Sequence, residues 1–224
     1  MLKHINQVSE QAFLLDFGSD IDIRTNSYVL SFAKRVFKEI EKDNYLEIKN
    51  CVPSYNKILI QFNPSSTKKL KILDFLHSID IKKIITDKDK KIGEMPICYD
   101  DEFALDIDDI AAKKQIKKAD IIDLHVSTKF YVYMIGFMPG LPFMGNLDER
   151  LSVPRKSTPR IHVPTGSVGI VDNLCVIYPD NSPGGWNIIG RTPQRLFFKE
   201  KNNPNLLNPG YFLKFKPISK KQFR

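Results

Sequence analysis

The sequence is poor in the features that mark secreted and membrane proteins. Only three cysteines occur among 224 residues, and they lie far apart without metal-site spacing. We interpret them as reduced structural thiols of a cytoplasmic protein. No apolar run reaches the roughly 18–20 residues that a membrane span needs, and the first residues lack the pattern of a signal peptide. These absences predict a cytoplasmic chain with no membrane partner.

Several catalytic motifs are also missing. The sequence has no serine-hydrolase elbow, no P-loop and no HExxH motif, so we predict neither a self-sufficient nucleophile nor a metal site. Histidine is scarce, with four in all. Two of them, His125 and His162, lie beside or within the loop-rich part of the chain described below. His125 ends an expected helix, where a cation is favourable, and is our histidine candidate for catalysis.

Charge of one sign is in excess, since 34 Lys and Arg against 26 Asp and Glu give a net charge of +8. An excess of this kind can indicate a nucleic-acid partner. Here the lysines are scattered in short groups and no aromatic residues alternate with them, as a stacking platform would require. We therefore expect a solvated basic surface and no nucleic-acid partner.

The first 85 residues show alternating strand and helix patterns. Residues 11–17 fit a strand, and apolar spacing over 27–40 predicts an amphipathic helix capped by Asn26 or Ser27. Strands are expected at 45–52 and 55–62, and a helix from about Ser66. The order β-α-β-β-α matches a ferredoxin-like unit, so we predict an N-terminal ferredoxin-like α/β sandwich over residues 1–85.

A polar stretch at 84–95 indicates a linker to a second domain over 92–224. This second domain is expected to contain a strand at 95–99, short helices near 107–114 and 119–126, and an apolar strand at 130–137. Short strands alternating with turns follow, which is the rhythm of a small β barrel or sandwich. We expect them near residues 161–163, 169–171, 174–177, 195–198 and 212–215. The overall fold class is thus α+β.

Glycine and proline are concentrated in residues 136–193, which hold eight of the 11 glycines and eight of the 14 prolines. Because glycine permits close backbone approach and proline fixes φ, this density predicts shaped loops that carry a site. In SPGGW, consecutive glycines can present amide donors beside the only tryptophan; the alternative is a tight hairpin. The candidate ligand-binding residues are Pro139, Gly140, Gly166, Ser167, Ser182, Gly184, Gly185, Trp186 and Asn187.

Arginines within the same stretch are candidates for holding an anion. Arg155 and Arg160 flank prolines that would fix them in place, and Arg191 follows SPGGW closely. A guanidinium suits carboxylate or phosphate. An internal ion pair with Asp148 or Glu149 is the alternative for the first two. We place these three arginines with His125 as the catalytic candidates.

Three motifs in this order carry a family resemblance: GFMPGLPFMGNLDERL, PRKSTPRIHVPTGSVGI and IYPDNSPGGWNIIGRTP. The chain resembles the family of the 5-oxoprolinase B subunit, also called kinase A inhibitor-like or allophanate hydrolase subunit one. Family members often carry an aromatic residue where Leu141 stands. The resemblance implies a cyclophilin-like barrel for the second domain.

The resemblance also implies one component of an ATP-dependent hydrolase that opens 5-oxoproline to glutamate. It implies homologues of the C and A subunits as partners, an amide or lactam substrate, and ATP with Mg²⁺ in the complex. The missing nucleophile predicts inactivity without those partners. The alternatives are a regulator of a histidine kinase, a component of the allophanate hydrolase or urea carboxylase type, and peptidyl-prolyl isomerisation, which only the implied fold suggests.

Overall fold

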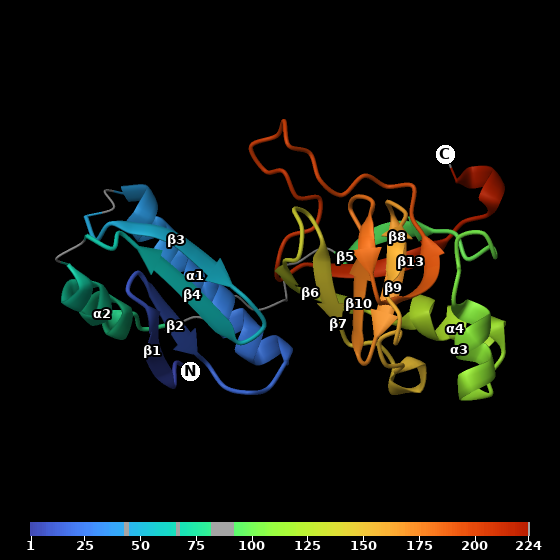
Figure 1. Cartoon of the computed structure of the whole chain (residues 1–224), viewed down its shortest axis with the longest axis horizontal. Helices are drawn as coiled ribbons and strands as arrows, with labels where there is room; N and C mark the ends of the chain where they lie inside the picture. The colour runs from blue at the N-terminus through green and yellow to red at the C-terminus, as the bar shows by residue number, and fades with distance from the viewer. Residues whose placement is uncertain (43–44, 66–67, 82–91, 224) are drawn as a thin grey trace. The chain divides into compact units, whose positions relative to one another are not determined.

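The chain forms two compact units, Met1–Asp89 and Lys90–Arg224, shown in Figure 1. This computed structural model describes residues 1–42, 45–65, 68–81 and 92–223. Residues 84–91 of the expected linker lie outside the described residues, so their role stays a prediction, as do the domain limits of 1–85 and 92–224. Residues 92–95 were wrongly assigned to the linker, since they lie in a strand, β5 (Ile92–Ile97), that pairs with β13 (Phe212–Pro217).

In its described residues, the first unit is a four-stranded antiparallel sheet with two helices. Its strands lie in the order β1-β2-β4-β3. The elements are β1 (His4–Ser9), β2 (Ala12–Asp16), α1 (Ile23–Lys42), β3 (Ile48–Pro53), β4 (Lys57–Phe62) and α2 (Lys69–Ser78). Alternate residues of β4, such as Ile58 and Ile60, are fully buried and join a core with the apolar side chains of both helices. The predicted β-α-β-β-α order runs from β2 to α2.

Two local predictions for this unit were wrong. No strand was expected at His4–Ser9 because most of its residues are polar and exposed, which hides the strand pattern. The first helix begins at Ile23 rather than 27, because the Asp22 carboxylate accepts the backbone N–H of Thr25 at 2.9 Å. Asn26 is instead buried and donates to the Ser54 and Tyr55 carbonyl oxygens.

The second unit is a nearly closed barrel, with strands in the order β12-β9-β10-β7-β6-β13-β5. A separate β11-β8 pair and helices α3 and α4 flank it. The elements are β5 (Ile92–Ile97), α3 (Ile107–Lys114), α4 (Lys118–Ser127), β6 (Phe130–Ile135), β7 (Pro142–Gly145), η2 (Glu149–Leu151), β8 (Arg160–Val163), β9 (Ser167–Val171), β10 (Leu174–Ile177), β11 (Ser182–Gly184), β12 (Asn187–Arg191), β13 (Phe212–Pro217) and η3 (Lys220–Gln222).

Two backbone hydrogen bonds close the barrel between its first strand and β12. The Cys98 N–H donates to the Arg191 carbonyl oxygen at 2.9 Å, and the Arg191 N–H donates back at 3.0 Å. Gly190 permits this approach, since a Cβ there would lie 2.8 Å from Ile97 Cδ1 and 2.9 Å from the Cys98 carbonyl oxygen. We call this pair the seam of the barrel.

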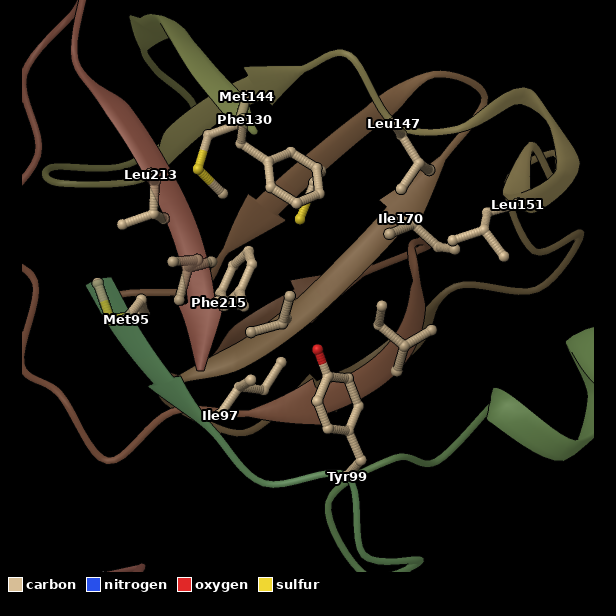
Figure 2. Close-up of a cluster of buried hydrophobic side chains, with 14 of the residues drawn as sticks. Met95, Ile97, Tyr99, Phe130, Met144, Leu147, Leu151, Ile170, Leu213 and Phe215 are labelled. Atoms are coloured by element: carbon tan, nitrogen blue, oxygen red, sulfur yellow. The ribbon is translucent and has the colours of Figure 1, made fainter. Parts of the chain in front are cut away.

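The barrel interior is filled with apolar side chains, among them Phe130, Ile170 and Phe215 (Figure 2). His125 reaches into this core from α4 and is fully buried. Its Nδ1 lies 2.7 Å from the Tyr99 hydroxyl and its Nε2 lies 3.7 Å from Cys175 Sγ. The tyrosine and the thiol thus provide polar neighbours for an imidazole in an otherwise apolar environment.

The mixed α/β architecture confirms the predicted α+β class and fits a cyclophilin-like second unit. Helices α3 and α4 lie where the sequence predicts them. The strand expected near 195–198 is absent, and only an isolated bridge joins Phe197 to Asn205 there. Strands β7 and β11 were not predicted, because proline and glycine conceal the alternation that strands usually show.

Candidate functional site

A pocket of about 280 Å³ opens within the second unit, between β7, β10, β11 and the loop that follows η2. We call it the Trp186 pocket. Its lining residues are Phe137, Leu141, Phe143, Arg155, Pro159, Val176, Tyr178, Pro183, Gly184, Gly185 and Trp186. The walls are therefore largely aromatic and aliphatic, with one cation among them. This volume lies at the lower end of the range for small-molecule sites.

The only tryptophan, in SPGGW, forms one wall of the pocket. Trp186 meets Phe143 edge to face, with ring centroids 5.9 Å apart. The Arg155 guanidinium carbon lies 5.8 Å from the centre of the Trp186 ring, within the range of a cation–π contact. In the described part of the chain, no carboxylate lies within ion-pair distance of Arg155.

Two glycines, Gly184 and Gly185, also line the pocket. A Cβ on Gly184 would collide with the Tyr178 hydroxyl, whereas a Cβ on Gly185 would make an ordinary contact 3.6 Å from Pro159 Cγ. Burial raises the pKa of the Tyr178 phenol despite the nearby Arg155 charge and a hydrogen bond with the Trp186 backbone. The phenol therefore keeps its proton at neutral pH and can donate it.

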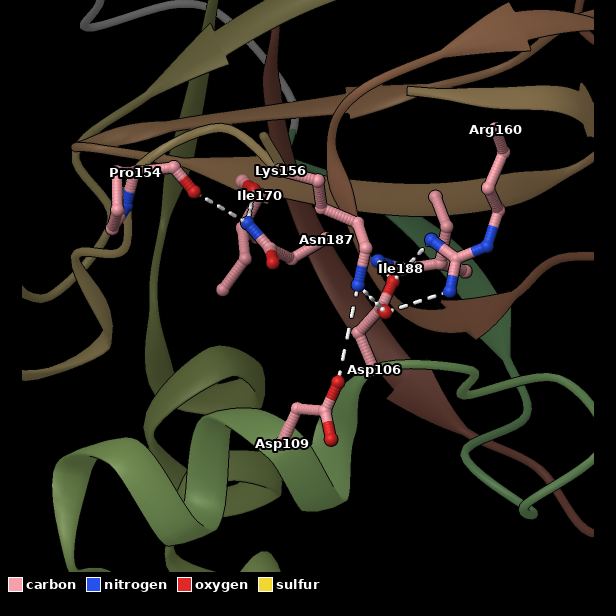
Figure 3. Close-up of polar contacts among 8 residues, drawn as sticks. All are labelled: Asp106, Asp109, Pro154, Lys156, Arg160, Ile170, Asn187 and Ile188. Carbon is pink, nitrogen blue, oxygen red and sulfur yellow. Dashed lines mark hydrogen bonds and ion pairs between the residues drawn. The ribbon is translucent and has the colours of Figure 1, made fainter. Parts of the chain in front are cut away.

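The other two cations of PRKSTPR are held by a buried carboxylate, Asp106, directly before α3 (Figure 3). Arg160 makes two hydrogen bonds of 2.7 Å to the two oxygens of Asp106. Lys156 donates to Oδ1 at 2.6 Å, and the Ile188 N–H donates to Oδ2 at 2.7 Å. We call these four residues the Asp106 cluster. It fastens the loop that carries Arg155 to β12 and to the start of α3.

Burial alone would raise the pKa of Asp106, which is 1% exposed. The hydrogen bonds from Arg160, Lys156 and the Ile188 amide outweigh that effect and hold the pKa below its ordinary value. Asp106 therefore stays ionised and neutralises part of the charge of its two cations. The alternative of an internal ion pair is thus correct for Arg160, although the expected acids are not its partners: Asp148 instead pairs with Arg150 at 2.7 Å.

Several predicted ligand-binding residues support the pocket without lining it. Asn187 is buried and donates to the carbonyl oxygens of Pro154 at 2.9 Å and Ile170 at 3.3 Å. The Ser182 hydroxyl donates to the Pro183 carbonyl oxygen at 3.1 Å. Gly166, in the turn before β9, and Ser167, the first residue of β9, are both buried. Gly166 has a φ of 83° and no room for a Cβ beside Thr192. Their roles in binding stay predictions.

Arg191 lies at the far end of β12 and is not among the pocket's lining residues. Its Nε donates to the Thr165 carbonyl oxygen at 2.6 Å, and its guanidinium carbon lies 5.7 Å from the Phe223 ring centre. The expectation that Arg191 and SPGGW face one cleft is therefore not met in this structure. Its contacts instead favour a role in holding the barrel seam.

His125 and the Pro139–Gly140 turn also lie apart from the pocket lining. Burial lowers the pKa of His125 to about 3, so the imidazole is neutral and enclosed, an arrangement that favours a structural role. Pro139 is exposed in the turn between β6 and β7. Gly140 has a φ of 84°, and a Cβ there would lie 2.7 Å from the Phe197 Cβ, so a larger residue would be strained.

Sequence reasoning missed three aromatic pocket residues, Phe137, Phe143 and Tyr178, and the carboxylate of Asp106. Phe137 is 69% exposed and has a φ of 67°, a conformation that is rare for a bulky residue and is found most often at functional sites. Both phenylalanines lie in FMPGLPFMG, within the first of the three family motifs. No local signal links Asp106 to Arg160, because 54 residues separate them.

Within residues 1–42, 45–65, 68–81 and 92–223, no group of three or more His, Cys, Asp and Glu side chains is arranged to hold a metal ion. Among the helices in these ranges, none is both long and apolar enough to cross a bilayer.

Comparison with known proteins relates the whole chain to one family. The family described as carboxyltransferase domain, subdomain C and D, matches residues 3–207. The 5-oxoprolinase B subunit of Bacillus subtilis is 32% identical over 230 residues, covering 98% of this chain and 94% of that protein. The B subunit of Haemophilus influenzae is 32% identical over 212 residues, covering 95% and 96%. The urea amidolyase of Saccharomyces cerevisiae is 23% identical, but this chain spans only 13% of it.

Solved structures give the same relationship. A crystal structure of TTHA0988 matches with a TM-score of 0.81 and 26% identity, covering 93% of this chain and 40% of that one. The uncharacterised protein PH0987 of Pyrococcus horikoshii is 36% identical with a TM-score of 0.59, covering 99% and 100%. The Kluyveromyces lactis urea carboxylase is 23% identical with a TM-score of 0.74, and the match covers 98% of this chain and 22% of that protein. At this identity the likeness supports the fold alone. The chain therefore belongs to the family of the 5-oxoprolinase B subunit, within the carboxyltransferase-domain proteins of subdomains C and D.

Proposed function

We propose that this protein is the B subunit of an ATP-dependent 5-oxoprolinase that acts with homologues of the C and A subunits in the cytoplasm. One observation carries the proposal: the chain and the Bacillus subtilis B subunit match over 98% and 94% of their lengths. A match of that extent spans both units of this chain, so the likeness is not confined to one shared domain.

Opening a lactam requires activation of a poor electrophile, because amide resonance stabilises the ring carbonyl. ATP would supply a phosphoryl group to that carbonyl oxygen, which makes the ring carbon open to attack by water. Cleavage of the ring C–N bond would then leave an acyl phosphate, and a second water would hydrolyse it to glutamate and phosphate. Fixed donors are needed for the charge that develops on oxygen. The amides of Gly184 and Gly185 and the Tyr178 hydroxyl lie on the wall where this chain would supply such donors.

The size and charge of the Trp186 pocket suit the lactam better than the nucleotide. The pocket holds about 280 Å³ and one cation without a carboxylate partner among the described residues, whereas a triphosphate carries several negative charges. Lys156 and Arg160 are already bound to Asp106. We therefore assign ATP, with its Mg²⁺, to a partner chain.

The pocket also needs a partner for chemistry. The only hydroxyl among its lining residues is that of Tyr178, and no lining residue is a Ser, Cys, His, Asp or Glu. A base or nucleophile must therefore come from another chain. The exposed side chains of Phe137 and Ile161, which are 69% and 93% exposed, are suitable apolar contacts for such a partner.

The test is reconstitution with the homologues of the C and A subunits. We expect the three chains together to form glutamate and ADP from 5-oxoproline and ATP, and each chain alone to form none. Turnover by this chain alone would contradict the shared site, and no turnover by the three chains would contradict the proposed function.

Urea-type chemistry is the second candidate, because the chain matches part of a urea amidolyase. The same reconstituted complex distinguishes the two. ATP hydrolysis that depends on allophanate or urea, and not on 5-oxoproline, would support the second candidate.

A further inference from the structure

We propose that the Trp186 pocket binds a small cyclic carboxylate and that Arg155 is its anion receptor. The lactam identity of the ligand rests on the proposed function, whereas the demand for a compact apolar body with one negative charge follows from the pocket itself. The family assignment depends on neither the pocket nor Arg155, so the proposed function and the binding-site assignment can be refuted separately.

Arg155 is the pocket cation that remains available to a ligand. Lys156 and Arg160, its neighbours in the same loop, both lie within 2.7 Å of Asp106 oxygens. In the ranges that the structure describes, Arg155 has no such partner, and its guanidinium rests 5.8 Å from the Trp186 ring centre. A cation–π contact uses the charge of the guanidinium and not its N–H donors, so these donors can bind a carboxylate.

The Asp106 cluster also fixes where Arg155 can be. The Lys156 N–H donates to the Gly185 carbonyl oxygen at 2.9 Å, while the Lys156 side chain is bound to Asp106. Asn187 holds the preceding Pro154 carbonyl at 2.9 Å. Arg155 thus lies between two anchored residues, so less chain entropy is lost when it binds an anion.

The remaining surfaces of the pocket suit a compact ring. Trp186 and Phe143 form an edge-to-face aromatic corner, and Leu141 and Val176 complete an apolar floor. The Tyr178 hydroxyl lies on the wall formed by Gly184 and can donate to a ring carbonyl. A five-membered lactam with a carboxylate offers each group a partner: a ring face, a carbonyl and a negative charge.

The chain carries its own reporter for the test, because its single tryptophan lines the pocket. Tryptophan fluorescence of the purified full-length protein is measured during titration with 5-oxoproline, and separately with its uncharged amide, 5-oxoprolinamide. We expect 5-oxoproline to bind at least about tenfold more tightly than the amide, since only the acid can form charge-assisted bonds.

Arg155→Gln should weaken 5-oxoproline binding by about tenfold or more and leave amide binding nearly unchanged. The affinity of Arg155→Lys for 5-oxoproline should lie between those of the native chain and Arg155→Gln. Arg195→Gln is the matched control, because Arg195 also rests on an aromatic ring, 5.0 Å from the centre of Phe198, but lies outside the pocket. Equal affinity for acid and amide, no effect of Arg155→Gln, or no binding of either compound would each overturn the proposal.

The reconstituted complex separates this inference from the proposed function. If Arg155→Gln leaves the KM for 5-oxoproline unchanged in an active complex, the site assignment is wrong and the function stands. If the chain binds the acid through Arg155 but the complex does not open it, the function is wrong and the binding site stands.

Discussion

The histidine at the centre of the barrel should make stability depend on pH. The pKa of His125 falls from 6.5 in the unfolded chain to about 3 in the folded one, because burial disfavours the charged imidazolium. Its contribution to stability is therefore complete above about pH 6.5 and is lost as the pH falls toward 3. At 1.36 kcal/mol per pH unit, lowering the pH from 6.5 to 5 should cost about 2 kcal/mol.

Urea unfolding of the native chain and of His125→Asn at pH 7, 6 and 5 measures this effect. Asparagine can still accept a hydrogen bond from Tyr99 but does not titrate, so its curve should be flatter. His162→Asn, the same substitution at an exposed histidine, is the control for the substitution itself. Parallel curves for the native chain and His125→Asn would show that His125 is not responsible.

Arg191 should matter for stability rather than for binding. Arg191→Lys loses the hydrogen bond from Nε to the Thr165 carbonyl oxygen, which measures 2.6 Å, and a planar contact with Phe223. We expect a loss of about 1 kcal/mol in the free energy of unfolding, with ligand titration of Trp186 unchanged. If Arg191→Lys instead weakened 5-oxoproline binding at unchanged stability, Arg191 would be a binding residue, as the sequence alone suggested.

At the scale of elements, the Asp106 cluster should be a main support of the barrel. Asp106→Asn removes the buried carboxylate that pairs with both Lys156 and Arg160. We expect a loss of about 2–3 kcal/mol, because removal of one partner of a buried ion pair is costly. Asp109→Asn is the matched control: Asp109 is 3.9 Å from the same Lys156, but its side chain is 64% exposed. The test is to compare the melting temperatures of the two variants with that of the native chain. Equally small decreases for Asp106→Asn and Asp109→Asn would show that the Asp106 cluster is not a main support.

How far the sequence predicts these elements depends on whether their determinants are local. Helices α3 and α4 were predicted closely because apolar spacing and first-turn acids such as Asp108 lie within each segment. Strand β11 was not expected, since Pro183 and Gly184 hide its pairing with β8. Trp186 and its glycines were predicted as a ligand site from local composition, and the structure places them on the walls of one pocket.

The part of the site that escaped prediction depends on distant residues. Asp106 contacts Arg160 across 54 positions and the Ile188 amide across 82. Nothing in the pattern before α3 reveals those partners. For the same reason, Arg191 was assigned to the site by its distance in sequence from SPGGW, although an extended strand carries it away from the pocket.

At the scale of the whole molecule, the two units should separate under mild proteolysis. Each has its own apolar core: one runs from Phe13 to Leu76, and the larger barrel core runs from Met95 to Phe215. We expect a protease to cut within 84–91 first, because that sequence is mostly polar while residues 92–95 pair with β13, and to leave a stable C-terminal fragment. Mass spectrometry of early fragments tests this, and early cleavage near residue 150 would contradict it.

The seam of the barrel has a consequence for the order in which the protein can be completed during synthesis. Strand β5 is the first of its unit to leave the ribosome, yet its sheet neighbour is β13, and its other tie is the Cys98–Arg191 pair. Both partners are made more than 90 residues later. The first unit, whose four strands pair within residues 4–62, can fold while translation continues. The barrel must wait for its last strand, and until then the nascent chain exposes an unpaired strand edge that chaperones would recognise.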